Sequence, residues 1–156
     1  MTGFVKAATA LFVAILLCDS PAHADFVFLT CGASAGSTYY MEGGTVSAAD
    51  AGWQKDGIDA GIQLLIKGDK TFDLISKGPP PNDFKYSDHG CQFGAVSLSP
   101  DKNELVVLVQ CPKQLEVFLF RWKDDKTGEV VRVDIASSGL SKHGGALHAT
   151  CQLGEH

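Results

Sequence analysis

Hydrophobic and polar residues alternate along much of this chain, in short runs separated by turn residues. Ile62, Leu64 and Ile66 occupy every second position of one run, which is the period of a strand with one buried face. Prolines fill the loop at 78–83, where they cannot continue a ladder of hydrogen bonds. The pattern predicts strands over residues 26–30, 62–67, 72–76, 93–98, 105–109, 115–122, 129–135 and 145–152.

The spacing of these runs predicts an all-β protein, an antiparallel sandwich, meander or partly open barrel of about seven or eight short strands. One short helix is expected near residues 48–55, because Ser47 and Asp50 have the spacing of a capping box and Gly57 would end the helix. We see neither an internal repeat nor a domain linker, so we expect a single domain.

Two strands joined by a turn at residues 124–128 each carry a regular apolar row on one face. The rows are Phe118, Phe120 and Trp122 in the first strand and Val131, Val133 and Ile135 in the second. Cross-strand pairing is expected to place the two rows together in the core.

Residues 32–61 are rich in glycine, serine and alanine and are expected to hold little regular structure. So long a loop in a compact domain is often functional. Tyr39, Tyr40 and Trp53 fall within it, and aromatic side chains offer a large apolar area. We take these three as a candidate binding surface, although the sequence favours the alternative that Tyr40 and Trp53 simply cover one open end of the sheet.

The first 24 residues have the parts of a cleaved secretory signal peptide. Lys6 precedes an apolar run over 7–18, which is shorter than the ~20 residues that span a bilayer as a helix. The small-x-small pattern Ala22-His23-Ala24 follows and predicts cleavage after Ala24. The mature domain would be residues 25–156, in the periplasm or outside the cell, with no membrane attachment.

A lipoprotein signal ending at Cys18 is the alternative, but Leu17 stands where such signals need a small residue. Cys18 is one of five cysteines in the chain of 156 residues, and it would leave with the signal peptide. The remaining four are expected to form two disulfides, because oxidising compartments keep such thiols paired.

The pairing of those four cysteines depends on one turn. A three-residue loop at Pro100–Lys102 sets Cys91 opposite Cys111, within disulfide range. A four-residue loop would shift the register by one and put the two sulfurs on opposite faces. We predict Cys91–Cys111, and Cys31–Cys151 joining the first and last strands.

One segment invites an enzymatic interpretation. Gly32-Ala33-Ser34-Ala35-Gly36 follows a predicted strand and matches the G-x-S-x-G pattern of a nucleophile elbow, with Ser34 as nucleophile. Such an elbow needs a helix immediately afterwards, and residues 37–44 are β-prone and then broken by glycine. A small serine hydrolase is therefore the second hypothesis.

Metal chemistry has weaker support. His89 lies near Cys91 and His148 near Cys151, but metal thiolates would compete with disulfide formation in an oxidising compartment. The acidic pair Asp124-Asp125 is explained by turn chemistry. We expect neither a metal nor a cofactor.

The net charge of the chain limits the kinds of partner that it can bind. The net charge of -5 argues against nucleic acid, which needs an excess of lysine and arginine. An exported small β domain with terminal cysteines is broadly similar to bacterial periplasmic proteins, lysozyme inhibitors among them, although no family motif matches residue by residue. We expect a monomeric, non-enzymatic binding or inhibitory module for a protein or small ligand of the cell envelope. The third hypothesis is a structural envelope protein without a specific ligand.

Overall fold

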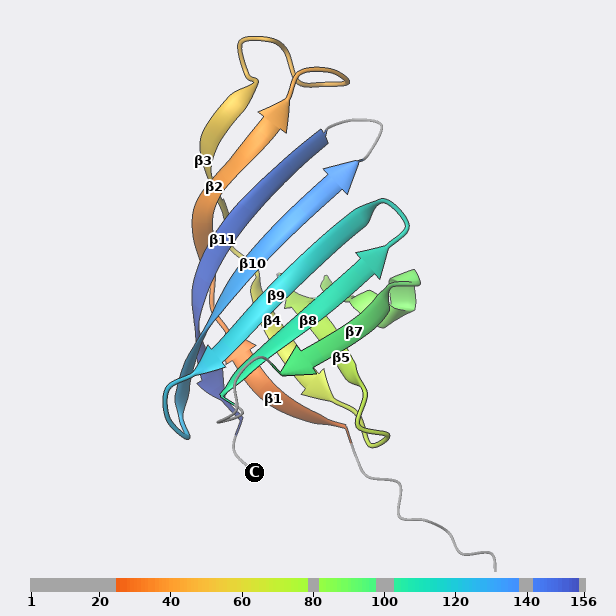
Figure 1. Cartoon of the computed structure of the whole chain (residues 1–156), viewed down its shortest axis with the longest axis vertical. Helices are drawn as coiled ribbons and strands as arrows, with labels where there is room; N and C mark the ends of the chain where they lie inside the picture. Colours follow the sequence, from red (N-terminus) through yellow and green to blue (C-terminus); the bar gives the residue numbers. More distant parts are fainter. Residues whose placement is uncertain (1–24, 79–81, 98–102, 138–141, 155–156) are drawn as a thin grey trace, which may run out of the picture.

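A computed structural model of the chain describes residues 25–78, 82–97, 103–137 and 142–154. They form an antiparallel sheet of 11 strands that curls into a half-barrel (Figure 1). The expected signal peptide and the 98–102 turn lie outside the described residues. The elements are β1 (Phe26–Cys31), β2 (Ser34–Met41), β3 (Gly52–Ile58), β4 (Gly61–Ile66), β5 (Phe72–Lys77), β6 (Asp83–Lys85), the 3-10 turn η1 (Tyr86–His89), β7 (Gln92–Ser97), β8 (Glu104–Cys111), β9 (Gln114–Trp122), β10 (Thr127–Ser137) and β11 (Lys142–Leu153).

The last strand, β11, joins the two parts of the sheet. Its main order is β6-β5-β4-β1-β11-β10-β9-β8-β7. The far end of β11 pairs with β1, and its first half, Lys142–His148, pairs with β2, which in turn pairs with β3. Gly36 and Gly145 allow this close approach, because a Cβ at Gly36 would lie 2.0 Å from the Ala146 carbonyl oxygen and one at Gly145 2.4 Å from Thr38 Oγ1.

The core lies on the concave side of the half-barrel. Figure 1 shows β4 and β5 passing behind β8 and β7, so that the sheet faces itself. Leu29, Leu64, Leu74, Phe118 and Phe120 are fully buried between these walls. Non-polar burial of this kind contributes about 1.5–3 kcal/mol for each large side chain.

Both predicted disulfides are present, Cys31–Cys151 and Cys91–Cys111. The register that leads to the second one is also confirmed. Gln92 pairs with Gln110 and Ser97 with Leu105, as counting outward from a three-residue loop requires. Two disulfides are compatible with an oxidising, exported location. Within the described ranges we find no helix long and apolar enough to cross a membrane.

The expected meeting of the two apolar rows is wrong. Phe118 pairs with Arg132 and Phe120 with Val130, so Val131, Val133 and Ile135 point to the convex side. The cause is a three-residue turn in which Asp124 accepts hydrogen bonds from Lys126 N (2.8 Å) and Thr127 N (2.6 Å). A shift of one residue exchanges the two faces of a strand.

The expected helix near 48–55 is also wrong, and residues 32–61 are not a long loop. Ser47 Oγ does donate to Asp50 Oδ2 (2.6 Å), but only a turn forms. Gly52 has φ +112°, which ends any helical path, and β3 then begins. Tyr39 pairs with Trp53, so cross-strand contact outweighs a weak helical tendency.

A buried carboxylate anchors η1 to the sheet. Asp73 has no exposed surface and accepts hydrogen bonds from Ser87 Oγ (2.6 Å) and Leu74 N (2.9 Å), with Lys67 Nζ at 3.2 Å. Burial by itself would raise the pKa of Asp73, but the hydrogen bonds from Ser87, Leu74 and Lys67 outweigh it and hold the pKa below its usual value. The anchor fixes the segment that carries Phe84, Tyr86 and His89.

Replacing this carboxylate should destabilise the fold. We expect Asp73→Ala to lower the free energy of unfolding by about 2–4 kcal/mol, because buried donors lose their acceptor. A depressed folded-state pKa contributes stability above the unfolded pKa, and this is lost as the pH falls through the folded value. Urea melts across the acid range check this: the stability difference between wild type and variant should shrink toward low pH. The exposed Asp125→Ala is the control, and an equal loss in both variants would contradict the anchor role.

Candidate functional site

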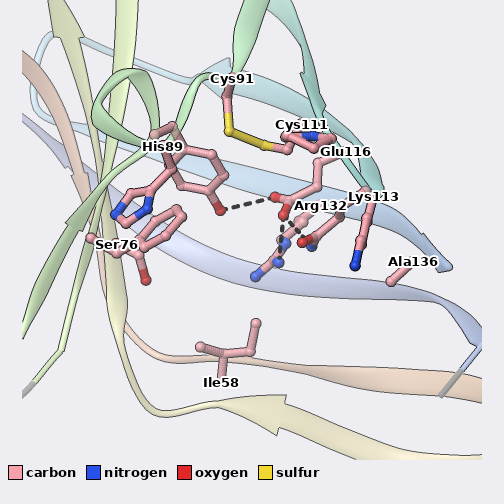
Figure 2. A pocket seen from close by; sticks show the side chains of 13 residues that line it. Ile58, Ser76, His89, Cys91, Cys111, Lys113, Glu116, Arg132 and Ala136 are labelled. Atoms are coloured by element: carbon pink, nitrogen blue, oxygen red, sulfur yellow. Dashed lines mark hydrogen bonds and ion pairs between the residues drawn. A yellow bond between two sulfur atoms is a disulfide. The ribbon is translucent and has the colours of Figure 1, made fainter. Parts of the chain in front are cut away.

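A cavity of about 520 Å³ opens on the concave side, within the range of small-ligand sites. Inner-face side chains of β9 and β10 form one wall, and the β6–η1 segment forms another. Figure 2 shows Ile58 across the cavity from Glu116 and Arg132. The lining also includes Ser76, Phe84, Tyr86, His89, Lys113, Gln114, Ala136 and the Cys91–Cys111 disulfide.

Glu116 is the centre of a buried polar network in this cavity. Its carboxylate accepts hydrogen bonds from Tyr86 Oη (3.0 Å), from Arg132 Nη2 (3.0 Å) and from Gln114 Nε2. The side chain of Glu116 is 2% exposed and that of Arg132 16%. The carboxylate is thus satisfied by three donors on three different elements.

Burial dominates the electrostatics of this network. Loss of hydration raises the pKa of Glu116 above its usual value, although Arg132 and the hydrogen bonds act in the opposite direction. Burial, and then the negative charge of Glu116, raise the pKa of Tyr86. Because Glu116 and Tyr86 are both buried, solvent screens their charges weakly.

Arg132 has donor capacity beyond its bond to Glu116. Among the described residues, its Nε is the one buried side-chain nitrogen or oxygen without a hydrogen-bond partner. The guanidinium carbon lies 5.8 Å from the centre of the Phe118 ring, so the group rests on the apolar floor. A guanidinium held in this way can bind an anionic group of a ligand.

The β6–η1 wall is aromatic. The rings of Phe84 and His89 are stacked with centres 4.0 Å apart, and Phe84 meets Tyr86 edge-on at 5.0 Å. Together with the Cys91–Cys111 disulfide, these rings give one side of the cavity a flat apolar surface. The cavity therefore joins a charged wall to an apolar one.

The concave face carries more polar groups beyond the cavity. His143 Nε2 lies 3.3 Å from the buried Asp134 Oδ2, and Tyr40 Oη donates to Asp56 Oδ2 (2.8 Å). That hydrogen bond is the largest cause raising the pKa of Tyr40 and lowering the pKa of Asp56. Toward β2 and β3 this face is thus polar.

The three aromatic residues expected to form one surface do not share a face. Tyr39 and Trp53 meet edge-on on the convex side, with ring centres 5.5 Å apart and exposed fractions of 41% and 71%. Tyr40 points to the concave side and contacts Asp56. Successive side chains of a strand point to opposite faces, so the neighbours Tyr39 and Tyr40 lie on opposite sides of the sheet.

Ser34 begins β2, and a strand rather than a helix follows it. It lines a small void of about 20 Å³ with Ile58 and Arg132, next to the main cavity. The backbone here thus lacks the strand–turn–helix of a nucleophile elbow. The hydrolase hypothesis stays a prediction.

The two His–Cys pairs have other roles. Cys91 and Cys151 are both in disulfides, His89 stacks on Phe84, and His148 Nε2 lies 3.3 Å from Glu129 Oε2. Asp124 shapes the turn before β10, where hydrogen bonds from Lys126 N, Thr127 N and the Thr127 hydroxyl lower its pKa.

Sequence reasoning missed Glu116, Arg132 and Tyr86. Glu116 and Arg132 sit in strands that are otherwise apolar, and in the expected register Arg132 would have faced solvent. The spacing of Asp124 and Thr127 could have indicated the correct register. An aspartate that accepts hydrogen bonds from its own turn fixes the turn length, and the turn length fixes which residues of the hairpin pair.

No protein-family model, curated protein or solved structure matches this chain.

Proposed function

We propose that this protein is an exported, non-enzymatic binding module that holds a small ligand in the concave cavity. One observation carries the proposal: a cavity of about 520 Å³ has a buried, hydrogen-bonded Glu116–Arg132 pair in its wall. A core built only for stability would fill this space, because buried ion pairs often contribute less than apolar packing of the same volume.

The lining indicates a ligand with an anionic group and a flat apolar body. Among the lining residues, Arg132 and Lys113 are positive and Glu116 is negative, and the buried carboxylate of Asp134 lies opposite Glu116 on β10. Glu116 already accepts three hydrogen bonds, whereas the Arg132 side chain keeps 16% of its surface exposed and lines the cavity, so its guanidinium is the cationic group that a ligand can reach. The stacked Phe84 and His89 rings suit a planar apolar body.

Export fits this function. The predicted signal peptide and the two disulfides agree with a protein that works outside the cytoplasm. A covalently stapled sheet keeps the cavity walls in place without a ligand, which reduces the ordering cost of binding.

The probe that tests the proposal is anilinonaphthalene sulfonate, a fluorescent anion with fused apolar rings. We expect the oxidised mature protein to bind it in the cavity, and Ala136→Trp to weaken binding at least about tenfold by filling the space, a cost of ~1.4 kcal/mol. A fluorescence titration measures this. Ala33→Trp, which adds the same ring at an exposed site outside the cavity, should bind like wild type.

A second control distinguishes probe binding in the cavity from probe binding on the convex side. Ile135→Glu changes the convex face and should leave binding of the cavity-bound probe unchanged. If Ile135→Glu abolishes the signal while Ala136→Trp does not, the probe binds elsewhere and the proposed function is contradicted.

A further inference from the structure

The convex side of the half-barrel carries a continuous apolar surface opposite the cavity. We call it the convex apolar face. Its exposed members are Tyr39, Met41, Trp53, Leu108, Leu115, Val133 and Ile135, and Val106, Val117, Leu119 and Val131 are partly buried among them.

The register of the strands makes this face contiguous. Val117 of β9 pairs with Leu108 on one side and with Val133 on the other. Leu115 of β9 pairs with Ile135. Ile135 pairs with Gly144, and Gly144 with Tyr39, which pairs with Trp53. Aliphatic side chains thus cover β8, β9 and β10, and the small apolar residues Gly144 and Ala146 of β11 lie between them and the aromatic pair.

The area is that of a protein interface. At ~200 Å² for each residue, a value in the range of aromatic side chains, the exposed fractions of 38–71% give an upper value of about 700 Å² of apolar surface, because the aliphatic side chains are smaller. The largest patch of a typical monomer is ~300–600 Å², and each partner of a standard interface contributes ~800 Å².

In place of the monomer expected from the sequence, we propose that a second copy of this chain covers the convex apolar face, in a two-fold dimer of packed sheets. Two sheets stack face to face with side chains interdigitating, and here the aliphatic ridge of β9 and β10 lies beside the small residues of β11. A two-fold interface uses the same patch on both copies, so the patch must complement itself.

The border of the face favours a second copy over a membrane. Along one side runs a charged row in which Arg121 lies 3.3 Å from Glu104, and Lys123 lies 3.7 Å from Glu129. Positive and negative side chains alternate along this row. A second copy in the inverted orientation can therefore place its charges opposite charges of the other sign. Binding to an anionic bilayer would need a basic border, and the chain has a net charge of -5.

Sedimentation velocity of the oxidised mature protein over a range of micromolar concentrations tests the dimer. We expect dimers in the wild type, and at least a roughly 100-fold larger dissociation constant in both Ile135→Glu and Leu108→Glu, because each places a charge inside the interface. Thr150→Glu adds the same charge to the convex side of β11 outside the face and should remain dimeric. Near-ultraviolet circular dichroism confirms that the variants are folded.

Two outcomes overturn the dimer. The first is a wild type that sediments as a monomer throughout, and the second is a dimer that both variants leave intact. Flotation of the monomer with vesicles of anionic and zwitterionic lipids would assign the face to a membrane instead. Because the cavity is on the opposite side of the sheet, these results leave the ligand test unaffected.

Discussion

Removal of the Cys31–Cys151 disulfide by Cys31→Ala/Cys151→Ala is expected to lower the free energy of unfolding by about 4–5 kcal/mol. The bridge spans 120 residues and ties β1 to β11, the two strands that join the parts of the sheet. Without it, the unfolded chain gains the freedom of a very long loop, and in the chain-entropy model this term grows with the logarithm of loop length. Urea unfolding of the variant under oxidising conditions measures the loss.

The second disulfide is the matched control. Cys91–Cys111 spans 20 residues within a single hairpin, so Cys91→Ala/Cys111→Ala should cost about 3 kcal/mol. The order of the two losses is the informative result. If the hairpin bridge proved the more stabilising of the two, loop length would not be what sets the contribution of each disulfide.

Breaking the buried ion pair should have an effect of similar size. We expect Glu116→Ala to lower the free energy of unfolding by about 3–5 kcal/mol, because Arg132 stays behind as a buried, uncompensated charge. Tyr86 Oη and Gln114 Nε2 lose the same acceptor. Thermal and urea melts of the variant measure the loss.

A double variant separates stability from function at this site. Glu116→Leu/Arg132→Met replaces the pair by apolar side chains of similar volume and should recover most of the lost stability. It should also weaken binding of anilinonaphthalene sulfonate, because the guanidinium is gone. A double variant no more stable than Glu116→Ala would show that the pair itself stabilises the fold.

Most of the fold could be predicted from the sequence because the strands alternate clearly and the cysteines restrict the register. The three-residue loop predicted at Pro100–Lys102 places Gln92 opposite Gln110, as the structure has it. Residues 32–61 were harder, since small residues in β2 and β3 hide the alternation. There, close packing of Gly36 against the backbone of Ala146 and of Gly145 against Thr38 decides the structure, and no local sequence pattern indicates it.

The cavity could not be predicted because it depends on a single choice of register. β9 and β10 have apolar residues on both faces, so either face could have been the buried one. The turn held by Asp124 selects the register that sets Arg132 beside Phe118 and Val130 beside Phe120, in place of the expected Val131, Val133 and Ile135. Arg132 and Asp134 therefore point inward, and Val133 and Ile135 are left outside, so one turn creates both the charged cavity wall and the convex apolar face.

Nuclear magnetic resonance locates the ligand most directly. In a titration of the isotope-labelled mature protein with anilinonaphthalene sulfonate, the largest amide shifts should cluster at residues 84–91, 113–116 and 132–136, around the cavity. The same titration of Ala136→Trp should lose these shifts. Shifts centred instead on Tyr39, Trp53 and Leu108, or the absence of saturable shifts at the cavity, would contradict a ligand site on the concave side.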